Sequence, residues 1–443
     1  KVVGVLATPT KQCRRLGECL LKGTAFHHAG LAPKQRELVE DGFRSGVVNV
    51  ISCTPTLAAG LDLPAFRAVI RDLKRFGARG MQNIPVLEYL QMSGRAGRPN
   101  YDTYGESICI SGTEGEKEAI VEKYVNGEPE EIYSKLAVEP VLRTYLLSLI
   151  SSKFVRSKKQ IMEFFGKTFW AFQFEDMGKL EEIIERMLGL LEGWEFIRSS
   201  KEEFISADEL DDVNFRATLL GKRVAELYLD PLTAFELVQG IKRAHAINAV
   251  DFSFFQLLCY TLEMRPLLSV RQKEYDIVDD AIVKYGSSIL MDEPEYFDDE
   301  HGDFMKSVKT ALFFMDWVGE KGEDALLEYY GIRPGEIRYK LNSADWLFYA
   351  MEELTRIIGF KELIKVIGRL RFRTKHGIKD ELVGLVRLRG IGRVRARKLF
   401  RNGIKDVRGL KKVDEGRLGT IIGVGMAKRL KDDVPTEVKR RRN

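Results

Sequence analysis

Two arginines in the segment "YLQMSGRAGRPNYD" (residues 89–102) are the side chains best suited to chemistry. Arg95 and Arg98 lie three residues apart, and each directly follows a glycine. The planar guanidinium is always charged and binds phosphate oxygens through two parallel hydrogen bonds. Glycines let the backbone approach a ligand closely. The segment therefore suits an anion with several oxygens, although by itself it is equally consistent with a glycine-rich turn that carries surface arginines.

Two further segments precede these arginines and narrow the interpretation. They are "FHHAGLAPKQRELVEDGFRSG" (26–46) and "TPTLAAGLDLPA" (54–65). Together with "QMSGRAGRP" (91–99), they resemble motifs IV, V and VI of the superfamily-2 helicases, in the same order. Strand-like runs lie between the blocks, as in a parallel α/β domain. The three ordered blocks favour a helicase over a simple surface turn.

This resemblance implies roles for individual residues. Arg95 and Arg98 look like arginine fingers, which stabilise the negative charge on a transferring phosphoryl group. Gln91 looks like a further polar group at the same cleft. Gly60 and Asp62 are expected to lie near the nucleotide. Thr54 and Thr56 are expected to bind a nucleic-acid phosphate.

The sequence contains no P-loop, the G-x-x-x-x-G-K-[ST] pattern that holds ATP phosphates. Its only G-K-T is at residues 166–168, and Ile161 stands where the first glycine should be. The acidic "MDEPEY" (291–296) has no preceding apolar strand and so is not a D-E-x-H box. We expect the chain to hold the second RecA-like domain without the first, as a fragment or one piece of a split helicase. ATP with Mg2+ would be bound mostly by the missing domain, and the chain alone is expected to be inactive.

The adjacent histidines His27 and His28 do not predict a metal centre. Neighbouring residues on a strand point to opposite faces, so the two rings make a poor chelate. No third ligand lies nearby in the sequence. We therefore predict no metal site in this chain.

Apolar patterning divides the chain into four predicted domains. Strands and helices alternate over residues 1–128, which indicates a parallel α/β domain. Helices followed by a β-like patch (203–218) predict a winged helix over 129–228. Long helices fill 229–378, and short helices joined by Gly-x-Gly turns fill 379–443, which ends in a basic tail. The predicted fold class is multidomain, α/β plus α.

Several shorter segments carry specific expectations. The helical period of residues 180–197 predicts one continuous helix. The acidic stretch 294–304 is expected to be a surface loop. Apolar or β-rich runs in the first domain are expected to alternate with helices, namely 2–8, 47–53, 67–73 and 106–112.

Nearly the whole chain, from residue 1 to about 430, resembles the archaeal Hjm-type DNA helicases, relatives of the polymerase-theta helicase domain. Beyond motifs IV to VI, "GEPEEIYSKL", "LYLDPLTA" and "HGIKDELVGLVRLRGIGRVRARKLF" carry the resemblance. It implies an ATP-dependent enzyme that unwinds DNA 3′ to 5′ at forks and at recombination and repair junctions. It also implies a RecA-like domain followed by a winged helix, a helical ratchet bundle and a helix-hairpin-helix domain.

The family also implies partners and a location. The expected partners are single-stranded and forked DNA, the first RecA-like domain, and replication or recombination proteins. A monomer in the cytoplasm, associated with the nucleoid, is expected.

The interval between motifs V and VI (71–89) is used by the family for a β-hairpin that separates DNA strands. Phe76 and Met81 flank its glycine-containing tip and could replace the stacking lost by the last base pair. A plain loop is the alternative.

Residues 333–357 are expected to form the ratchet helix. An apolar stripe from Ile337 to Met351 at helical spacing is its core face. Tyr339 and Trp346 lie on the other face, with Arg338 at its flank, and exposed aromatic rings there would stack on single-stranded bases. Burial of Trp346 against another helix is the alternative. The family often has arginine where Tyr339 stands, which points to Arg338 as the phosphate contact.

The segment 388–404 predicts a helix-hairpin-helix, a unit that binds DNA backbone without reading sequence. The turn around Gly390 and Gly392 offers free amides to a phosphate. Cations surround this turn and are also predicted to contact DNA, namely Arg393, Arg395, Arg397 and Lys398. Residues 421–430 repeat the pattern.

Composition sets wider bounds on the class of protein. The 443 residues are 44% hydrophobic and 30% charged, which indicates globular domains rather than disorder. Five cysteines without C-x-x-C spacing predict reduced thiols in a cytosolic protein. Two alternatives stay open, an RNA helicase of the same superfamily and a non-catalytic DNA-binding module with a RecA-like fold.

Overall fold

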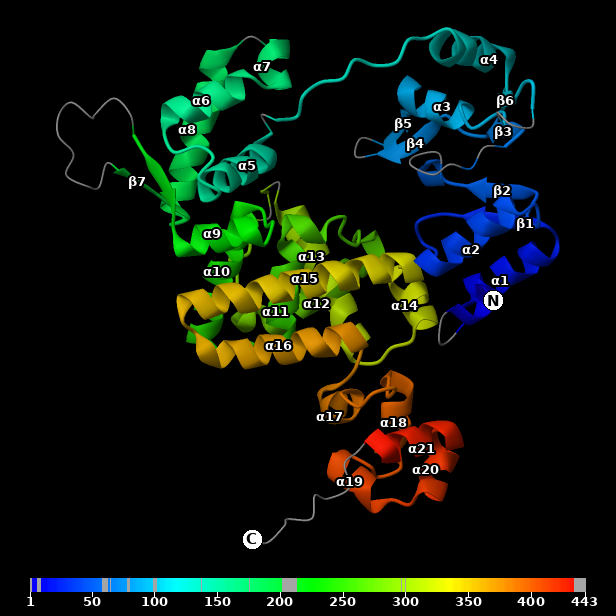
Figure 1. Cartoon of the computed structure of the whole chain (residues 1–443), viewed down its shortest axis with the longest axis vertical. Helices are drawn as coiled ribbons and strands as arrows, with labels where there is room; N and C mark the ends of the chain where they lie inside the picture. The colour runs from blue at the N-terminus through cyan, green and yellow to red at the C-terminus, as the bar shows by residue number, and fades with distance from the viewer. Residues whose placement is uncertain are drawn as a thin grey trace. The chain divides into compact units, whose positions relative to one another are not determined.

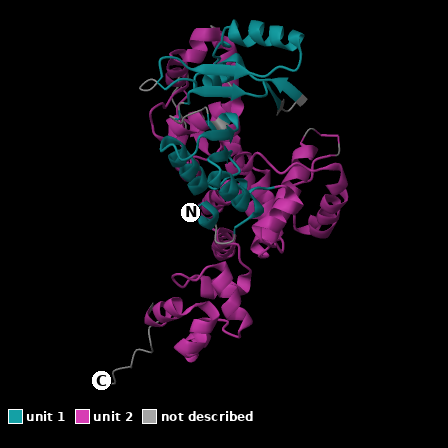
Figure 2. Cartoon of the chain, turned by 90° about the vertical axis from the view of Figure 1, so that its right-hand side faces the viewer, with its two compact units in different colours: residues 1–133, 332–338 teal, residues 134–331, 339–443 magenta. Residues whose placement is uncertain are grey.

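The computed structural model describes the chain except for short stretches. Those outside the described residues are 1, 6–8, 58–62, 64, 78–79, 99–101, 137, 175, 201–212, 296, 299 and 434–443. The described residues form two compact units (Figure 2). Unit 1 comprises Lys1–Tyr133 and Ile332–Arg338, and unit 2 comprises Ser134–Gly331 and Tyr339–Asn443.

Unit 1 contains short strands that alternate with helices (Figure 1). Its strands are β1 (Thr24–His27), β2 (Val50–Cys53), β3 (Arg67–Ile70), β4 (Lys74–Gly77), β5 (Gly80–Asn83) and β6 (Glu106–Cys109). Its helices and helical turns are η1 (Val2–Val5), α1 (Lys11–Leu21), α2 (Pro33–Arg44), η2 (Pro55–Leu57), α3 (Val86–Ser93), α4 (Glu114–Ile120) and η3 (Val121–Val125).

The described strands of unit 1 form separate two-stranded sheets. β1 pairs with β2 and β3 with β6, both in parallel, while β4 and β5 form an antiparallel hairpin. Parallel neighbours need a crossover connection, and helices supply it here. Buried side chains of α1, α2 and β1, including Leu16 and Val39, form one small core. A second core joins β3 and α3 through Ile70, Val86 and Tyr89.

The first apolar run does not form a strand in the described residues. Val2–Val5 is a single 3-10 turn, and residues 6–8 lie outside the described residues. Val2 is buried in the core of α1 and α2, and its carbonyl accepts a hydrogen bond from Gln35 Nε2. Apolar content alone did not distinguish a buried turn from a strand here.

The first part of unit 2 is a group of helices with a small antiparallel hairpin. Its elements are α5 (Glu139–Ser151), α6 (Lys158–Gly166), α7 (Phe169–Phe174), α8 (Met177–Gly193), β7 (Ile197–Ser199), β8 (Phe215–Ala217) and α9 (Leu219–Glu226). The predicted continuous helix over 180–197 is wrong at its end, because α8 stops at Gly193 and Glu195 has a positive φ of 62°. Of the predicted β-like patch, residues 203–212 lie outside the described residues and Phe215–Ala217 is a strand.

Longer helices follow. They are α10 (Pro231–Ala246), α11 (Asp251–Tyr260), η6 (Leu262–Met264), η7 (Gln272–Glu274), α12 (Tyr275–Tyr285), η8 (Gly286–Ser288), α13 (His301–Val318), α14 (Glu323–Tyr330), α15 (Pro334–Ile358) and α16 (Lys361–His376). The helix α11 is buried on every side, from Phe252 to Cys259, as a central helix must be. The acidic stretch 294–304 is not all loop, because α13 begins at His301.

The helices α15 and α16 lie side by side in unit 2 (Figure 1). Arg371 of α16 forms a salt bridge with Asp345 of α15 at 2.8 Å. The first residues of α15 belong to unit 1 and the rest to unit 2. Among the described residues, no helix is both long enough and apolar enough to cross a membrane.

The last part of unit 2 consists of short helices around their own core. They are η9 (Asp380–Leu382), α17 (Val383–Val386), α18 (Arg393–Arg401), α19 (Val407–Lys412), α20 (Glu415–Ile422) and α21 (Val424–Asp433). Ala396, Leu399, Leu418 and Ala427 are among the buried residues of this core. Short turns connect α17 to α18 and α20 to α21, as the repeated Gly-x-Gly pattern predicts.

Candidate functional site

The loop that carries the two arginines follows α3 directly. α3 ends at Ser93 with Gly94 as its cap, and Arg95 comes next. The carbonyl of Arg95 accepts a hydrogen bond from the Ala65 amide (2.9 Å), and the Gly97 amide donates to the Ala65 carbonyl (2.7 Å). The end of motif V and the arginine loop of motif VI are therefore held together by backbone bonds.

Two glycines make this close approach possible. Gly97 has a positive φ of 94°, a conformation that side chains other than glycine rarely adopt. A Cβ on Gly105 would lie 2.3 Å from the Gly97 amide nitrogen, so Gly105 must also be glycine. Gly97 of the motif and Gly105 beyond it thus set the path of the loop.

Arg98 is exposed and held by a neighbouring carboxylate. Its Nε and Nη2 donate to the two oxygens of Asp102 at 2.7 and 2.8 Å, and its amide donates to the same carboxylate at 3.0 Å. The hydrogen bond from Arg98 lowers the pKa of Asp102, so the carboxylate stays ionised at neutral pH. This bidentate pair fixes the guanidinium while almost half of the Arg98 side chain (45%) faces solvent.

Sequence reasoning missed a residue that positions α3. The carboxylate of Glu130 accepts hydrogen bonds from the amides of Val86 (2.7 Å) and Leu87 (3.1 Å) at the start of this helix. Those bonds lower the pKa of Glu130, and a negative charge is favourable at a helix N-terminus. In the sequence, the "GEPEEI" segment carries only a family resemblance, because no local pattern predicts a hydrogen bond between Glu130 and Val86, 44 positions away.

Motifs IV and V also meet. His27, the last residue of β1, pairs with Cys53 of β2, and the Thr54 amide donates to the His27 carbonyl at 3.2 Å. Thr54 is exposed just beyond the strand. Thr56 lies in η2, with its side chain outside the described residues, and Gly60 and Asp62 fall outside them altogether. Gln91 is exposed on α3.

The predicted hairpin between motifs V and VI is confirmed. In it, Phe76 of β4 stands opposite Met81 of β5, and the tip residues 78–79 lie outside the described residues. Met81 is 64% exposed, while the side chain of Phe76 is outside the described set. Tyr124 Oη donates to the Ile84 carbonyl (2.9 Å) and ties the base of the hairpin to η3.

The face of α15 shows a mixed outcome. Ile337, Leu341 and Met351 are buried, as the predicted apolar stripe requires. Arg338 is exposed and Tyr339 is 52% exposed. Trp346, in contrast, is partly buried, and its Nε1 donates to the Leu227 carbonyl at 3.1 Å. Trp346 therefore packs within the protein, and only the remaining part of its ring could contact a base.

The helix-hairpin-helix cations divide into two pairs. Arg395 and Lys398 are exposed on α18. Arg397 is partly buried and binds the Glu320 carboxylate at 2.6 and 2.7 Å, while Arg393 donates to the Glu320 and Lys321 carbonyls and lies over the Trp317 ring. Although burial acts against it, hydrogen bonding to Arg397 lowers the pKa of Glu320.

The turn before α18 contains both glycines, but the Ile391 amide between them is not free, because it donates to the Leu388 carbonyl at 3.1 Å. Gly390 has a positive φ of 79°, and Gly392 is the N-cap of α18. The guanidinium of Arg395 donates to the Gly390 carbonyl (2.8 Å), which places an exposed cation beside the turn.

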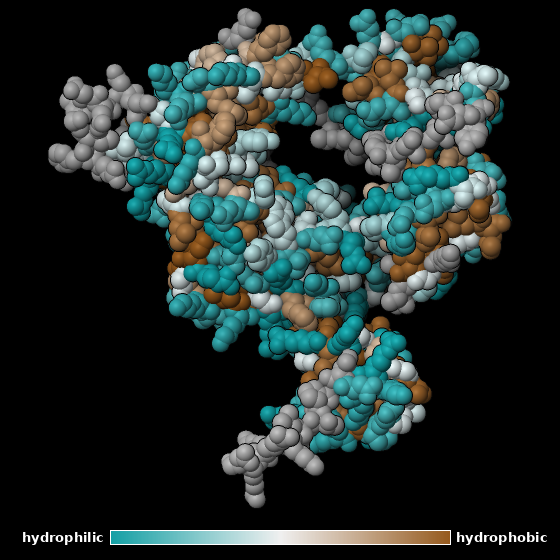
Figure 3. Space-filling model, viewed as in Figure 1, coloured by the Kyte–Doolittle hydropathy of each residue, from teal (hydrophilic) through white to brown (hydrophobic). Residues whose placement is uncertain are grey.

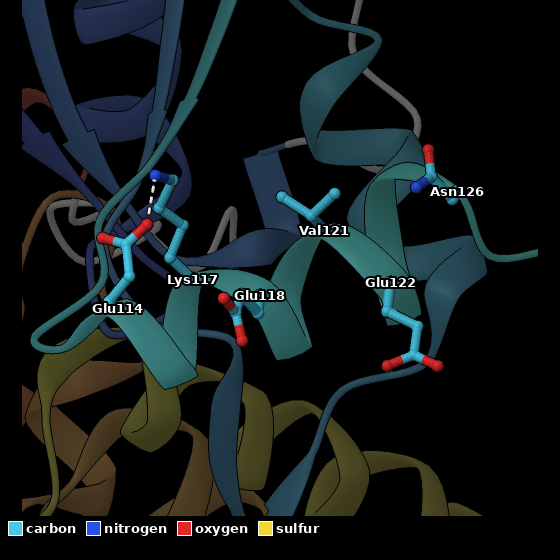
Figure 4. A pocket seen from close by; sticks show the side chains of 6 residues that line it. All are labelled: Glu114, Lys117, Glu118, Val121, Glu122 and Asn126. Atoms are coloured by element: carbon cyan, nitrogen blue, oxygen red, sulfur yellow. Dashed lines mark hydrogen bonds and ion pairs between the residues drawn. The ribbon is translucent and has the colours of Figure 1, made fainter.

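Two surface features lie apart from the predicted sites. A depression of about 300 Å³ on α4 and η3 (Figure 4) is lined by Glu114, Lys117, Glu118, Val121, Glu122 and Asn126. Its carboxylates would repel a phosphate, so it does not suit a nucleotide. Hydrophobic residues also gather over α7 (Figure 3), where Phe169 and Phe172 are 51% and 78% exposed.

The chain resembles known helicases along almost all of its length. Family profiles match three successive segments, described as "Helicase conserved C-terminal domain" (6–100), "Helix-turn-helix domain" (105–198) and "Archaeal helicase, domain 4" (252–377). The first covers the motif IV to VI region, and the last covers all of α15.

Curated relatives give the same result. A protein of Methanococcus vannielii named ATP-dependent DNA helicase Hel308 is 35% identical over 98% of this chain and 60% of its own length. Its namesakes from Methanocella arvoryzae and Pyrococcus abyssi are 38% and 37% identical over 94% of this chain. The chain spans 55 to 60% of the length of these three relatives.

Proposed function

This chain belongs to the Hel308-type family of archaeal superfamily-2 helicases, and we propose that it supplies the arginine fingers and the DNA-tracking elements of an ATP-dependent DNA helicase. The observation that carries the proposal is the arginine loop. Backbone bonds with Ala65 fix the loop, and Asp102 binds Nε and Nη2 of Arg98, whose side chain is 45% exposed. A fixed, exposed guanidinium is what a finger acting on a nucleotide bound elsewhere requires.

The residues present fit the phosphate part of ATP. Arginine nitrogens only donate hydrogen bonds, so Arg95 and Arg98 can bind phosphoryl oxygens but cannot bind Mg2+. The described residues contain no cluster of three or more His, Cys, Asp or Glu side chains that could hold a metal ion. When ATP is bound, it would supply the terminal phosphoryl group that is transferred. The role of Arg98 is to stabilise the charge that develops on the transferring oxygens.

We further propose the finer division of the chain into four domains. Residues 1–128 form the second RecA-like domain, 129–228 a winged helix, 229–378 a helical ratchet domain and 379–443 a helix-hairpin-helix domain. The parallel strand pairs, the β7–β8 hairpin beside helices and the buried core of the last helices support this division.

The proposed DNA contacts follow the exposed residues. Thr54 would bind a phosphate, and the β4–β5 hairpin would separate strands through Met81 and Phe76. Arg338 and Tyr339 would grip the single strand on α15, with Trp346 beside them. The helix-hairpin-helix of residues 388–404 would bind duplex backbone through the Gly390–Gly392 turn, Arg395 and Lys398.

Strand separation by the full-length protein tests this function. Matched DNA and RNA forks of one sequence are offered with ATP, and we expect the DNA fork to be unwound. Preferential unwinding of the RNA fork would show that the protein is an RNA helicase of the same superfamily. Tight fork binding with no ATP-dependent unwinding of either substrate would instead support a non-catalytic DNA-binding module.

A further inference from the structure

The first turn of α15 is docked on the turn that follows β1, and both segments belong to unit 1. The amide of Gly335 donates to the carbonyl of Gly30 at 3.0 Å. The first amides of a helix have no partner within the helix. Pro334 has no amide hydrogen, and the amide of Arg333 is satisfied by the Glu336 carboxylate at 2.7 Å. The Gly30 carbonyl therefore satisfies a donor that α15 itself cannot.

The two backbones approach so closely that position 335 must be glycine. A Cβ added to Gly335 would lie 2.2 Å from the Ala29 carbonyl oxygen and 2.6 Å from that of Leu31. Both atoms are backbone, so no side-chain movement relieves the overlap. We call this close backbone contact between Gly335 and residues 29–31 the joint.

The turn at the other side of the joint is itself braced. Nδ1 of His28 accepts a hydrogen bond from the backbone amide of Gly30 at 3.0 Å, and its protonated Nε2 lies 2.8 Å from the side-chain amide group of Gln12 on α1. Burial, with the nearby charge of Arg333, lowers the pKa of His28, so the ring is neutral and Nδ1 can accept. His28, which directly follows β1 in motif IV, therefore holds the turn on which α15 is docked.

We propose that the His28–Gly30 turn positions α15, so that a movement of β1 and motif IV shifts the helix that carries Arg338 and Tyr339. This rests on the proposed helicase function and assigns motif IV a mechanical role in it. α15 is one uninterrupted helix of 25 residues, which makes it a rod about 37 Å long. Tyr339 lies four residues, or one helical turn, beyond Gly335, so a shift at the joint reaches it almost undiminished.

A pair of glycine substitutions tests the joint in the 443-residue chain without any assay of function. Gly335 is the second residue of α15, and Gly302 is the second residue of α13, where an added Cβ would meet nothing within 4 Å. Alanine normally stabilises a helical position relative to glycine. We therefore expect Gly302→Ala to keep or raise the melting temperature and Gly335→Ala to lower it. The Gly335 amide should also be protected from hydrogen exchange. A melting temperature for Gly335→Ala at or above that of the wild type overturns the joint.

The same variants in the full-length enzyme test the mechanical role. The readout is base pairs unwound per ATP hydrolysed, because a purely structural defect would lower both quantities together. We expect Gly335→Ala to lower this ratio about tenfold, because a 1 Å misplacement of a positioned group can cost about a hundredfold in rate. His28→Ala, which introduces no clash, should lower it less, and Gly302→Ala should not change it.

The possible outcomes separate the two proposals. If the wild type unwinds DNA and both Gly335→Ala and His28→Ala keep its ratio, the positioning role is wrong. If the wild type does not unwind, the proposed function fails, and the melting experiment alone decides whether the joint exists.

Discussion

Arginines in this chain differ in what their guanidinium groups contact, and the contact decides the role. Arg98 pairs with Asp102, four residues away, so the sequence already holds its partner. Arg397 pairs with Glu320, which is 77 positions away, so no local pattern predicts that pair. The sequence therefore predicted which cations could contact DNA, but it could not predict that Arg397 pairs with a carboxylate far away in the chain.

Glu236 gives a pH dependence that can be measured. Burial raises the pKa of Glu236 to about 7, with Asp230, Glu263 and Glu300 adding negative charge nearby and Arg143 opposing them. The folded state then keeps a proton that the unfolded state releases above its ordinary pKa of 4.5. The stability from this proton is complete below that value and is lost as pH rises through about 7.

Glu236→Gln removes this dependence. Near pH 4.5 we expect little change in stability. At pH 8 we expect the variant to melt at a higher temperature than the wild type, with an unfolding free energy higher by about 3 kcal/mol. Glu182→Gln, at an exposed position of α8, is the control and should show no such divergence. A constant difference between Glu236→Gln and wild type across this range would contradict the assignment.

Elements with a local signal were predicted well, and elements that depend on distant packing were not. The apolar stripe of α15 follows from nearby residues, and the β4–β5 hairpin was implied by the family resemblance; both are present. The end of α8 and the 3-10 turn at Val2–Val5 depend on what packs beside them. The partial burial of Trp346 against Leu227 belongs to the second class, because its partner lies 119 positions away.

Substitutions of Trp346 separate packing from base stacking. Trp346→Phe keeps an aromatic ring but removes the donor to the Leu227 carbonyl, so we expect a loss of about 1 kcal/mol in stability and nearly normal single-strand affinity. Trp346→Ala should lower stability further and also remove about 1–3 kcal/mol of single-strand binding. Melting curves and fluorescence titration with single-stranded DNA measure the two effects. Unchanged DNA affinity in Trp346→Ala would make this residue purely structural.

The cations of α18 offer a matched comparison. Arg395 is exposed beside the Gly390 turn, whereas Arg397 is bound to Glu320. We expect Arg395→Ala to weaken duplex binding and to reduce the salt dependence of binding by about one released counterion. Arg397→Ala should mainly lower the melting temperature, because the partly buried Glu320 loses the guanidinium that pairs with it. The reverse pattern would show that Arg397 leaves Glu320 to bind DNA.

At the scale of the whole molecule, sequence patterning predicted several domains, and the structure groups the described residues into two units. Unit 1 runs to Tyr133 and also includes Ile332–Arg338, whereas the division into four domains remains a proposal. The assignment of the first residues of α15 to unit 1 was not predictable. It depends on the close contact of Gly335 with residues 29–31, which only the folded backbone reveals.

The 443-residue polypeptide should not hydrolyse ATP on its own. Its sequence has no P-loop pattern, so the finger has no phosphate cradle to act on. A coupled phosphate-release assay with and without single-stranded DNA measures this directly. DNA-stimulated turnover by the purified polypeptide would show that another part of the chain binds the nucleotide.

The most direct test of the account is the turnover of Arg98→Ala in the full-length enzyme. Arg44→Ala is the matched control, because Arg44 is also about half exposed (48%) and also pairs with an aspartate on its own segment. We predict that Arg98→Ala lowers kcat by about 10³-fold or more while ATP affinity stays nearly unchanged, since a finger acts on charge that develops only in the transition state. Arg44→Ala should behave as the wild type. An Arg98→Ala enzyme with normal kcat and only a raised KM would contradict the central claim.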